Sequence, residues 1–135
     1  LVLENGQEVE NLTKILKKIQ DAGAFSYLAV IKYHRAHEGM LSFSDRGFSV
    51  ALDFPNTPKI LALLDELDMM LLDMGGRVYL AKDARMRHEV FEQMYKHHLP
   101  EWREVLKQVD PGRKINSAMA RRLEFKPPIA IRNNN

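Results

Sequence analysis

The sequence predicts an α+β fold, with an antiparallel or mixed sheet and helices packed mainly on one face. Apolar residues recur with helical spacing in several segments, and other segments alternate in the period of a strand. All six prolines and most glycines fall between these segments. The predicted order is helix, strand, strand, helix, strand, helix, helix.

Four segments are predicted to be helical. Residues 8–21 carry one apolar stripe, with oppositely charged residues spaced four apart on the outside. The second helix should begin at Thr57-Pro58, a capping residue followed by proline, and end at Gly75-Gly76. Two further helices are expected around residues 90–95 and from Pro100 onward.

Three segments are predicted to be strands: 25–34, 47–54 and 77–82. In the first, one face is apolar and should pack on the core, whereas the other is mixed. The apolar face comprises Phe25, Tyr27, Ala29, Ile31 and Tyr33. In the second strand, large residues from Phe48 to Phe54 should face the core and small ones should lie opposite.

The composition is that of one ordinary globular domain of 135 residues, with 45% hydrophobic and 28% charged residues. The chain has no cysteine, which excludes disulfides and thiolate chemistry, and it shows neither a signal peptide nor an apolar run long enough to span a membrane. A cytoplasmic protein is therefore expected. Because the sequence starts at Leu1 and not at Met, we expect it to be a piece of a longer protein.

Charge is unevenly distributed along the chain. Residues 1–75 contain seven Lys and Arg against eleven Asp and Glu, whereas residues 76–135 contain thirteen against seven. The basic end is consistent with a solvated tail, with a docking strip for the rest of a protein, or with binding to nucleic acid, an anionic ligand or a membrane surface.

Most catalytic motifs are missing. Neither glycine-rich nucleotide-binding motif occurs, no GxSxG supports a hydrolase, and the histidines lack the spacing of a metal site. No metal is therefore expected. Tyr79 and Lys82 remain, a phenol and an amine near the end of the third predicted strand, where a core aromatic and a surface amine are the plainer interpretation.

The run GGRVYLAKDAR, from Gly75 to Arg85, resembles the C-terminal segment of bacterial FAD-linked oxidoreductases of the vanillyl-alcohol-oxidase type. The nearest branch is that of the decaprenylphosphoryl-β-D-ribose 2′-oxidases and sugar-lactone oxidases. Further segments follow in the family's order over roughly residues 24–123: FSYLAVIK, LSF, LDFP, MY, EWR, VDP and MARRL.

The resemblance implies that residues 1–123 form the C-terminal part of a substrate domain, that 124–135 form a basic, flexible tail, and that the FAD-binding domain lies outside this chain. It also implies hydride transfer from a sugar or sugar-phosphate hydroxyl to FAD, with a separate reductase as a possible partner. The isolated chain should be inactive.

The resemblance also assigns roles to individual residues. Lys82 corresponds to the active-site lysine beside flavin and substrate, and Tyr79 to a tyrosine that positions the sugar. Leu28, Val30, Lys32, His34, Ser49 and Ala51 correspond to pocket positions. Strict strand alternation would put Tyr79 and Lys82 on opposite faces, so both reach one site only if the strand ends or bulges near Ala81.

Two departures leave the substrate open: His34 replaces a phenylalanine and Ala51 a cysteine found in the arabinan-pathway branch. An alternative is a stand-alone α+β module whose basic tail contacts nucleic acid. Because RNA-binding sheets expose aromatic residues, and those of residues 25–33 are expected in the core, nucleic-acid binding is not expected. A scaffold whose helices pair with a partner is a third interpretation.

Overall fold

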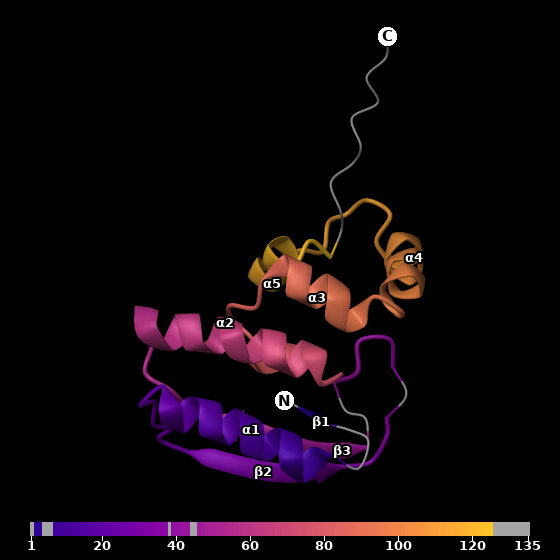
Figure 1. The fold of residues 1–135 in the computed structure, drawn as a ribbon. Helices are drawn as coiled ribbons and strands as arrows, with labels where there is room; N and C mark the ends of the chain where they lie inside the picture. Colours follow the sequence, from indigo (N-terminus) through magenta and orange to yellow (C-terminus); the bar gives the residue numbers. More distant parts are fainter. Residues whose placement is uncertain (1, 4–6, 38, 44–45, 126–135) are drawn as a thin grey trace.

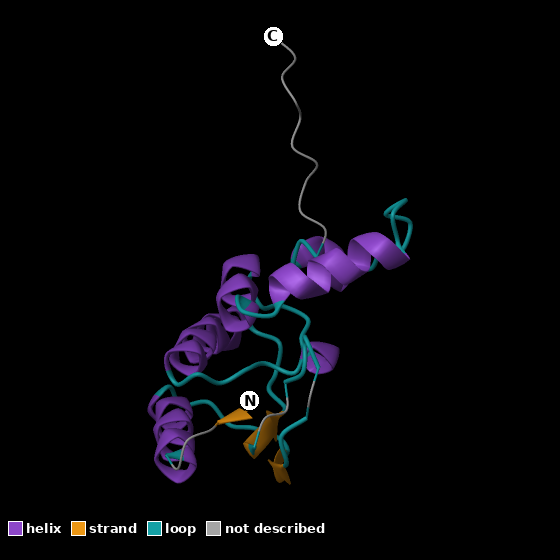
Figure 2. Cartoon of the chain, turned by 90° about the vertical axis from the view of Figure 1, so that its right-hand side faces the viewer, coloured by secondary structure: helices purple, strands orange, loops and turns teal. Residues whose placement is uncertain are grey.

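The computed structural model describes residues 2–3, 7–37, 39–43 and 46–125. Three antiparallel strands lie in the order β1-β3-β2, with bounds Val2–Leu3, Ala29–His34 and Gly47–Leu52 for β1, β2 and β3. Helices α1 (Glu8–Asp21) and α2 (Pro58–Asp73) lie on one side of the strands (Figures 1 and 2). Helices α3, α4 and α5 lie beyond α2, with bounds His88–Tyr95, Leu99–Val109 and Ala118–Arg122. The α+β class is confirmed.

Helix α2 lies between two hydrophobic cores. Its residues Ile60, Leu63 and Leu67 belong to a core shared with α1 and with the end of β3. Its last turn contributes Leu71 to a second core, built mainly from Met86, α3 and the fully buried Leu123. The apolar side chains of α2 therefore hold the sheet and the C-terminal helices in one unit.

Local signals set the ends of α2 as predicted. The Thr57 side chain accepts a hydrogen bond from the Ile60 amide at 3.3 Å, and Pro58 occupies the first turn, where a missing amide proton costs nothing. Gly75 follows the helix with φ +73°, a conformation that strains residues with a Cβ. Among the described residues, no helix is both long and apolar enough to cross a bilayer.

The third predicted strand is wrong. Residues 77–82 contain an isolated bridge at Arg77 and then a 3-10 helix, η1, spanning Leu80–Lys82. The segment has the composition of a strand, but a strand forms only where it can pair with a neighbouring strand. Among the described residues the sheet ends at β2 on one side and at β1 on the other, so residues 77–82 are not part of it. The structure also adds β1 and α5, which the sequence did not predict.

The expectation that the odd-numbered face of residues 25–33 packs in the core is also wrong. Phe25 is 81% exposed and Tyr27 80%, while Ile31 and Tyr33 are more than half exposed. The reason is coverage: β3 lies under the helices and its Val50 is 8% exposed, whereas β2 lies at the sheet edge beyond them. The argument against nucleic acid that rested on buried aromatics therefore fails.

We predict that Gly75→Ala lowers the free energy of unfolding by about 1 kcal/mol, because an L residue is strained at this positive φ. The effect isolates backbone strain, since no atom lies within 4 Å of the added Cβ. Urea unfolding measures it. Gly112→Ala is the control: Gly112 is not among the positive-φ glycines, and its new Cβ would meet only the flexible Lys114 side chain. Equal losses in both variants would contradict the prediction.

Candidate active site

The register of β2 against β3 gathers the predicted pocket residues on one face of the sheet. Residues directly opposite in an antiparallel pair project to the same side. The opposite pairs on this face are Val30–Ala51, Lys32–Ser49 and His34–Gly47. The other face carries Val50 and Leu52 toward α1 and α2, so this row projects away from the helices.

The row remains accessible. Leu28 continues it one residue before β2, where its carbonyl oxygen accepts a hydrogen bond from the Asp53 amide at 3.2 Å, and its side chain is 57% exposed. Lys32 and Ala51 are exposed, and Val30, His34 and Ser49 are half-buried. All six predicted pocket positions therefore share one open surface.

A chain of contacts leads from this surface to Tyr79. His34 Nε2 lies 2.6 Å from Ser49 Oγ, a hydrogen bond across the two strands. The His34 ring meets Phe43 edge-on, with 5.5 Å between centroids, and Phe43 packs against Tyr79 at 4.2 Å. Tyr79, which is far along the sequence, is thereby joined to the β2–β3 surface.

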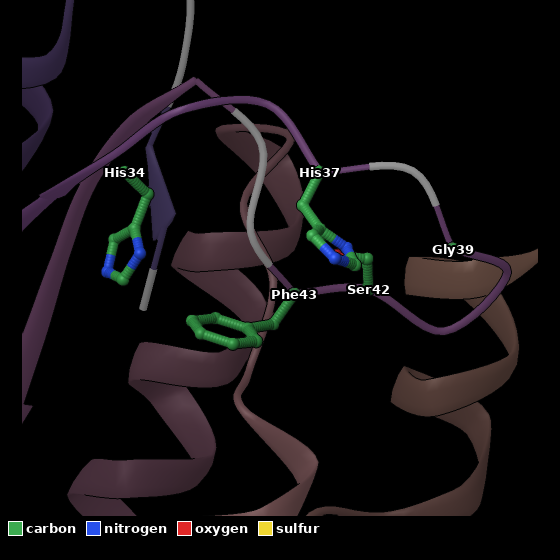
Figure 3. A pocket seen from close by; sticks show the side chains of 5 residues that line it. All are labelled: His34, His37, Gly39, Ser42 and Phe43. Carbon is green, nitrogen blue, oxygen red and sulfur yellow. The ribbon is translucent and has the colours of Figure 1, made fainter.

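A hollow of about 410 Å³ opens beside these rings, lined by His34, His37, Gly39, Ser42 and Phe43 (Figure 3). Sequence reasoning gave a role to His34 alone of these residues. Phe43 belongs to the LSF segment that carried the family resemblance, but only the folded chain shows it between His34 and Tyr79. Arg77 Nη1 donates to the Ser42 carbonyl oxygen at 3.1 Å and ties this loop to the segment before Tyr79.

A 3-10 turn, and not a strand, separates Tyr79 from Lys82. The Lys82 amide donates to the Tyr79 carbonyl oxygen at 2.9 Å, and residues three apart in such a turn lie on the same side. Tyr79 is 41% exposed, and Lys82 is also exposed. In the described part of the chain no carboxylate pairs with Lys82, and Lys82 is not among the residues that line the hollow beside His34 and Phe43.

Asp83 fixes the end of this turn. Its side chain is 2% exposed, and Oδ1 accepts hydrogen bonds from the Arg85 and Met86 amides at 3.0 and 2.8 Å. Arg122 of α5 donates from Nη2 to Asp83 Oδ2 at 2.7 Å and from Nη1 to the Met86 carbonyl oxygen. A buried carboxylate is stable only when paired in this way.

Two further contacts hold the same segment from the side of α2 and α3. The Arg85 guanidinium donates two hydrogen bonds to the Asp68 carboxylate, with N–O distances of 2.8 and 3.0 Å, and one to the Asp65 carboxylate at 2.9 Å. Burial raises the pKa of Asp68, against the lowering effect of Arg85. The Tyr95 hydroxyl donates to the Val78 carbonyl oxygen at 3.2 Å, and burial raises the pKa of Tyr95 to about 12.

We predict that Arg122→Met loosens the Tyr79–Lys82 turn, because it leaves the buried Asp83 carboxylate without its cationic partner. Amide hydrogen exchange at Lys82 and Asp83 should rise about tenfold or more, while exchange within α1 should stay the same. Arg121→Met is the control, since the Arg121 side chain is exposed. Unchanged exchange at Lys82 in the Arg122 variant would show that the ion pair does not hold the turn.

Known proteins resemble this chain over most of its length. It is 38% identical over 120 residues to the decaprenylphosphoryl-beta-D-ribose oxidase of Mycolicibacterium smegmatis, a match that covers 88% of this chain and 26% of that protein. It is 37% identical over 114 residues to the uncharacterized protein in mprA 5′region of Streptomyces coelicolor, covering 83% of this chain and 31% of that protein. The chain thus spans between a quarter and a third of the length of these relatives.

The profile of a protein family described as D-arabinono-1,4-lactone oxidase matches residues 49–123. The matched range begins in β3 at Ser49 and includes the Tyr79–Lys82 turn, Asp83 and Arg122. It therefore contains the turn together with the ion pair that anchors it. The chain belongs to the D-arabinono-1,4-lactone oxidase family.

Proposed function

We propose that this chain is the C-terminal part of an FAD-dependent oxidoreductase that oxidises a hydroxyl group of a sugar or sugar phosphate by hydride transfer to the flavin. The polypeptide that holds most of the FAD lies outside the 135 residues in this proposal. The main support is that an accessible β2–β3 surface meets Tyr79 through His34 and Phe43 in a member of an oxidase family.

The side chains around the turn suit a group that gains negative charge. When bound, FAD would supply the hydride acceptor, a ring system that becomes more negative on reduction. Lys82 is a cation without a carboxylate partner among the described residues, on a turn fixed by Asp83. Such a positioned cation stabilises developing charge more than a mobile one does, because it needs no reorganisation during the reaction.

The remaining residues suit a polar, anionic substrate. The Tyr79 hydroxyl can donate to or accept from a sugar hydroxyl, and the Phe43 ring offers an apolar face beside it. Lys32 projects from the same sheet face as Ser49 and His34, where it would attract a phosphate group. Oxidation would yield a keto sugar, a substrate for a separate reductase.

The open site explains why the chain should be inactive by itself. Two unit charges 4 Å apart interact by about 1 kcal/mol in water and by about 4 kcal/mol near a partly desolvated protein surface. Lys82 is exposed in this chain and so lies near the weaker limit. A covering domain that excludes water would strengthen its effect.

The direct test is to express the whole open reading frame that contains this sequence and to record its absorbance. We expect a yellow protein with flavin bands that are bleached by a sugar or sugar-phosphate substrate under anaerobic conditions. The 135-residue chain, purified in parallel, should be colourless. A colourless full-length product without a flavin-binding domain would refute the proposal.

We predict that Lys82→Met in the full-length protein slows flavin reduction by substrate about 100-fold or more, because the cation is lost where charge develops. Stopped-flow absorbance measures the rate. Lys107→Met is the matched control: its side chain is 73% exposed and lies on α4, paired with Glu104. Full-rate reduction in the Lys82 variant would remove the role assigned to this residue.

A further inference from the structure

The edge of the sheet at β2 combines an open backbone with exposed apolar side chains. In the order β1-β3-β2, the described residues pair β2 with β3 only. We define the β2 strip as Phe25, Tyr27, Ile31 and Tyr33, with exposed fractions of 81, 80, 53 and 56%. An exposed edge strand is a template for a further strand, and natural proteins normally protect it.

The helix layer stops short of this edge. Ile31 lies opposite Val50 and Tyr33 opposite Phe48, so these pairs share the face toward α1 and α2. Yet Val50 is 8% exposed and Ile31 53%. On this face of the sheet, Val50 of β3 is therefore covered, whereas its neighbour Ile31 of β2 is not. An additional strand beside β2 would place its own side chains next to Ile31 and Tyr33 and extend the covered layer.

The charge around the strip disfavours a nucleic acid. Between Lys18 and Lys32 the sequence contains no lysine or arginine, although Asp21 lies within that interval. Arg46 reaches the Tyr33 end of the strip, where its Nε donates to the Tyr33 hydroxyl at 3.3 Å, but in the described part of the chain no cation makes such a contact with the rest of the strip. Binding to a nucleic acid depends mainly on cations that neutralise phosphates. Lys32 projects to the other face of the sheet, with Ser49. The strip thus offers apolar surface and backbone hydrogen bonds, which suit a β-strand of polypeptide.

We propose that β2 pairs with a further β-strand from polypeptide of the same protein outside residues 1–135, whose apolar side chains cover the β2 strip. The length of the relatives supports this occupant, because the matched region is 26% and 31% of those proteins. The inference rests on the proposed function, in that it takes the chain to be part of a longer oxidase.

The test compares hydrogen exchange in the 135-residue chain with that in the protein expressed from the whole open reading frame. We expect the alternate amides within residues 29–34 that face away from β3 to exchange about 100-fold more slowly in the longer protein, because only these amides gain a strand partner. The amides of Phe48 and Ser49 in β3, which pair with β1 on one side and β2 on the other in this chain, are the internal reference and should change less. Equal exchange of β2 in both proteins would overturn the proposal.

A substitution gives a second test, because it should change the melting temperature of the longer protein but not that of the 135-residue chain. Ile31→Lys should leave the melting temperature of the 135-residue chain nearly unchanged, since Ile31 is 53% exposed there. In the longer protein it should lower the melting temperature by about 5 °C, because the lysine is then forced against the covering strand. Val109→Lys on α4 is the matched control, because Val109 is 67% exposed, and it should be neutral in both. An Ile31 variant as stable as wild type in the longer protein would contradict the inference.

Other occupants give different results. If the longer protein is a dimer and β2 loses its protection on dilution to the monomer, a second copy covers the strip and the proposal is wrong. Binding of single-stranded RNA that Ile31→Lys abolishes and Val109→Lys preserves would also overturn it. Flavin absorbance of the same sample separates the two proposals: a yellow protein with unprotected β2 refutes only the strand, and a colourless one with protected β2 refutes only the oxidase function.

Discussion

The buried carboxylate of Asp83 is the interaction on which the candidate site depends most. It accepts two backbone amides from the residues that follow it and a charged hydrogen bond from Arg122. The segment from Arg77 to Lys82 has only an isolated bridge, so sheet hydrogen bonds cannot define its shape. Side-chain anchors replace the missing ladder, and they come from helices on either side of the turn.

This arrangement divides the molecule into a rigid support and an open face. Helix α2 joins two cores that together contain the buried hydrophobic residues of the described chain apart from Val50. The β2–β3 surface carrying Lys32 and Ser49 projects away from that support. The fold therefore supports this face of the sheet from behind and leaves Lys32 and Ala51 on it exposed. A lone chain with such a surface can orient a ligand but cannot exclude water from it.

Much of the helical structure follows from local sequence. The cap at Thr57, the proline after it and the glycine at the end of α2 act within a few residues, so they are visible without a fold. Alternation likewise placed Val30 and Lys32 on one strand face and Ser49 on one face of the next. Only the register shows that the two faces coincide.

The two wrong predictions, the third strand and the buried face of residues 25–33, share a physical cause: both features depend on residues that are distant in the sequence. Val78, Tyr79 and Leu80 have the preferences of a strand, yet no strand in the part of the chain that the structure describes pairs with them, and the Asp83 contacts fix a turn. For Ile31 and Tyr33, alternation gives the face but not whether anything covers it. The Phe43–Tyr79 and Asp83–Arg122 contacts join residues separated by 36 or more positions, and no local pattern encodes them.

The packing of residues 123–125 has a practical consequence for truncating the chain. Positive charge accumulates after Asp110, which would suggest trimming there. However, Leu123 is fully buried, and the Phe125 ring lies 5.4 Å from Phe91 and 4.8 Å from Trp102. A truncation that ends before Phe125 would therefore remove an aromatic ring from the second core.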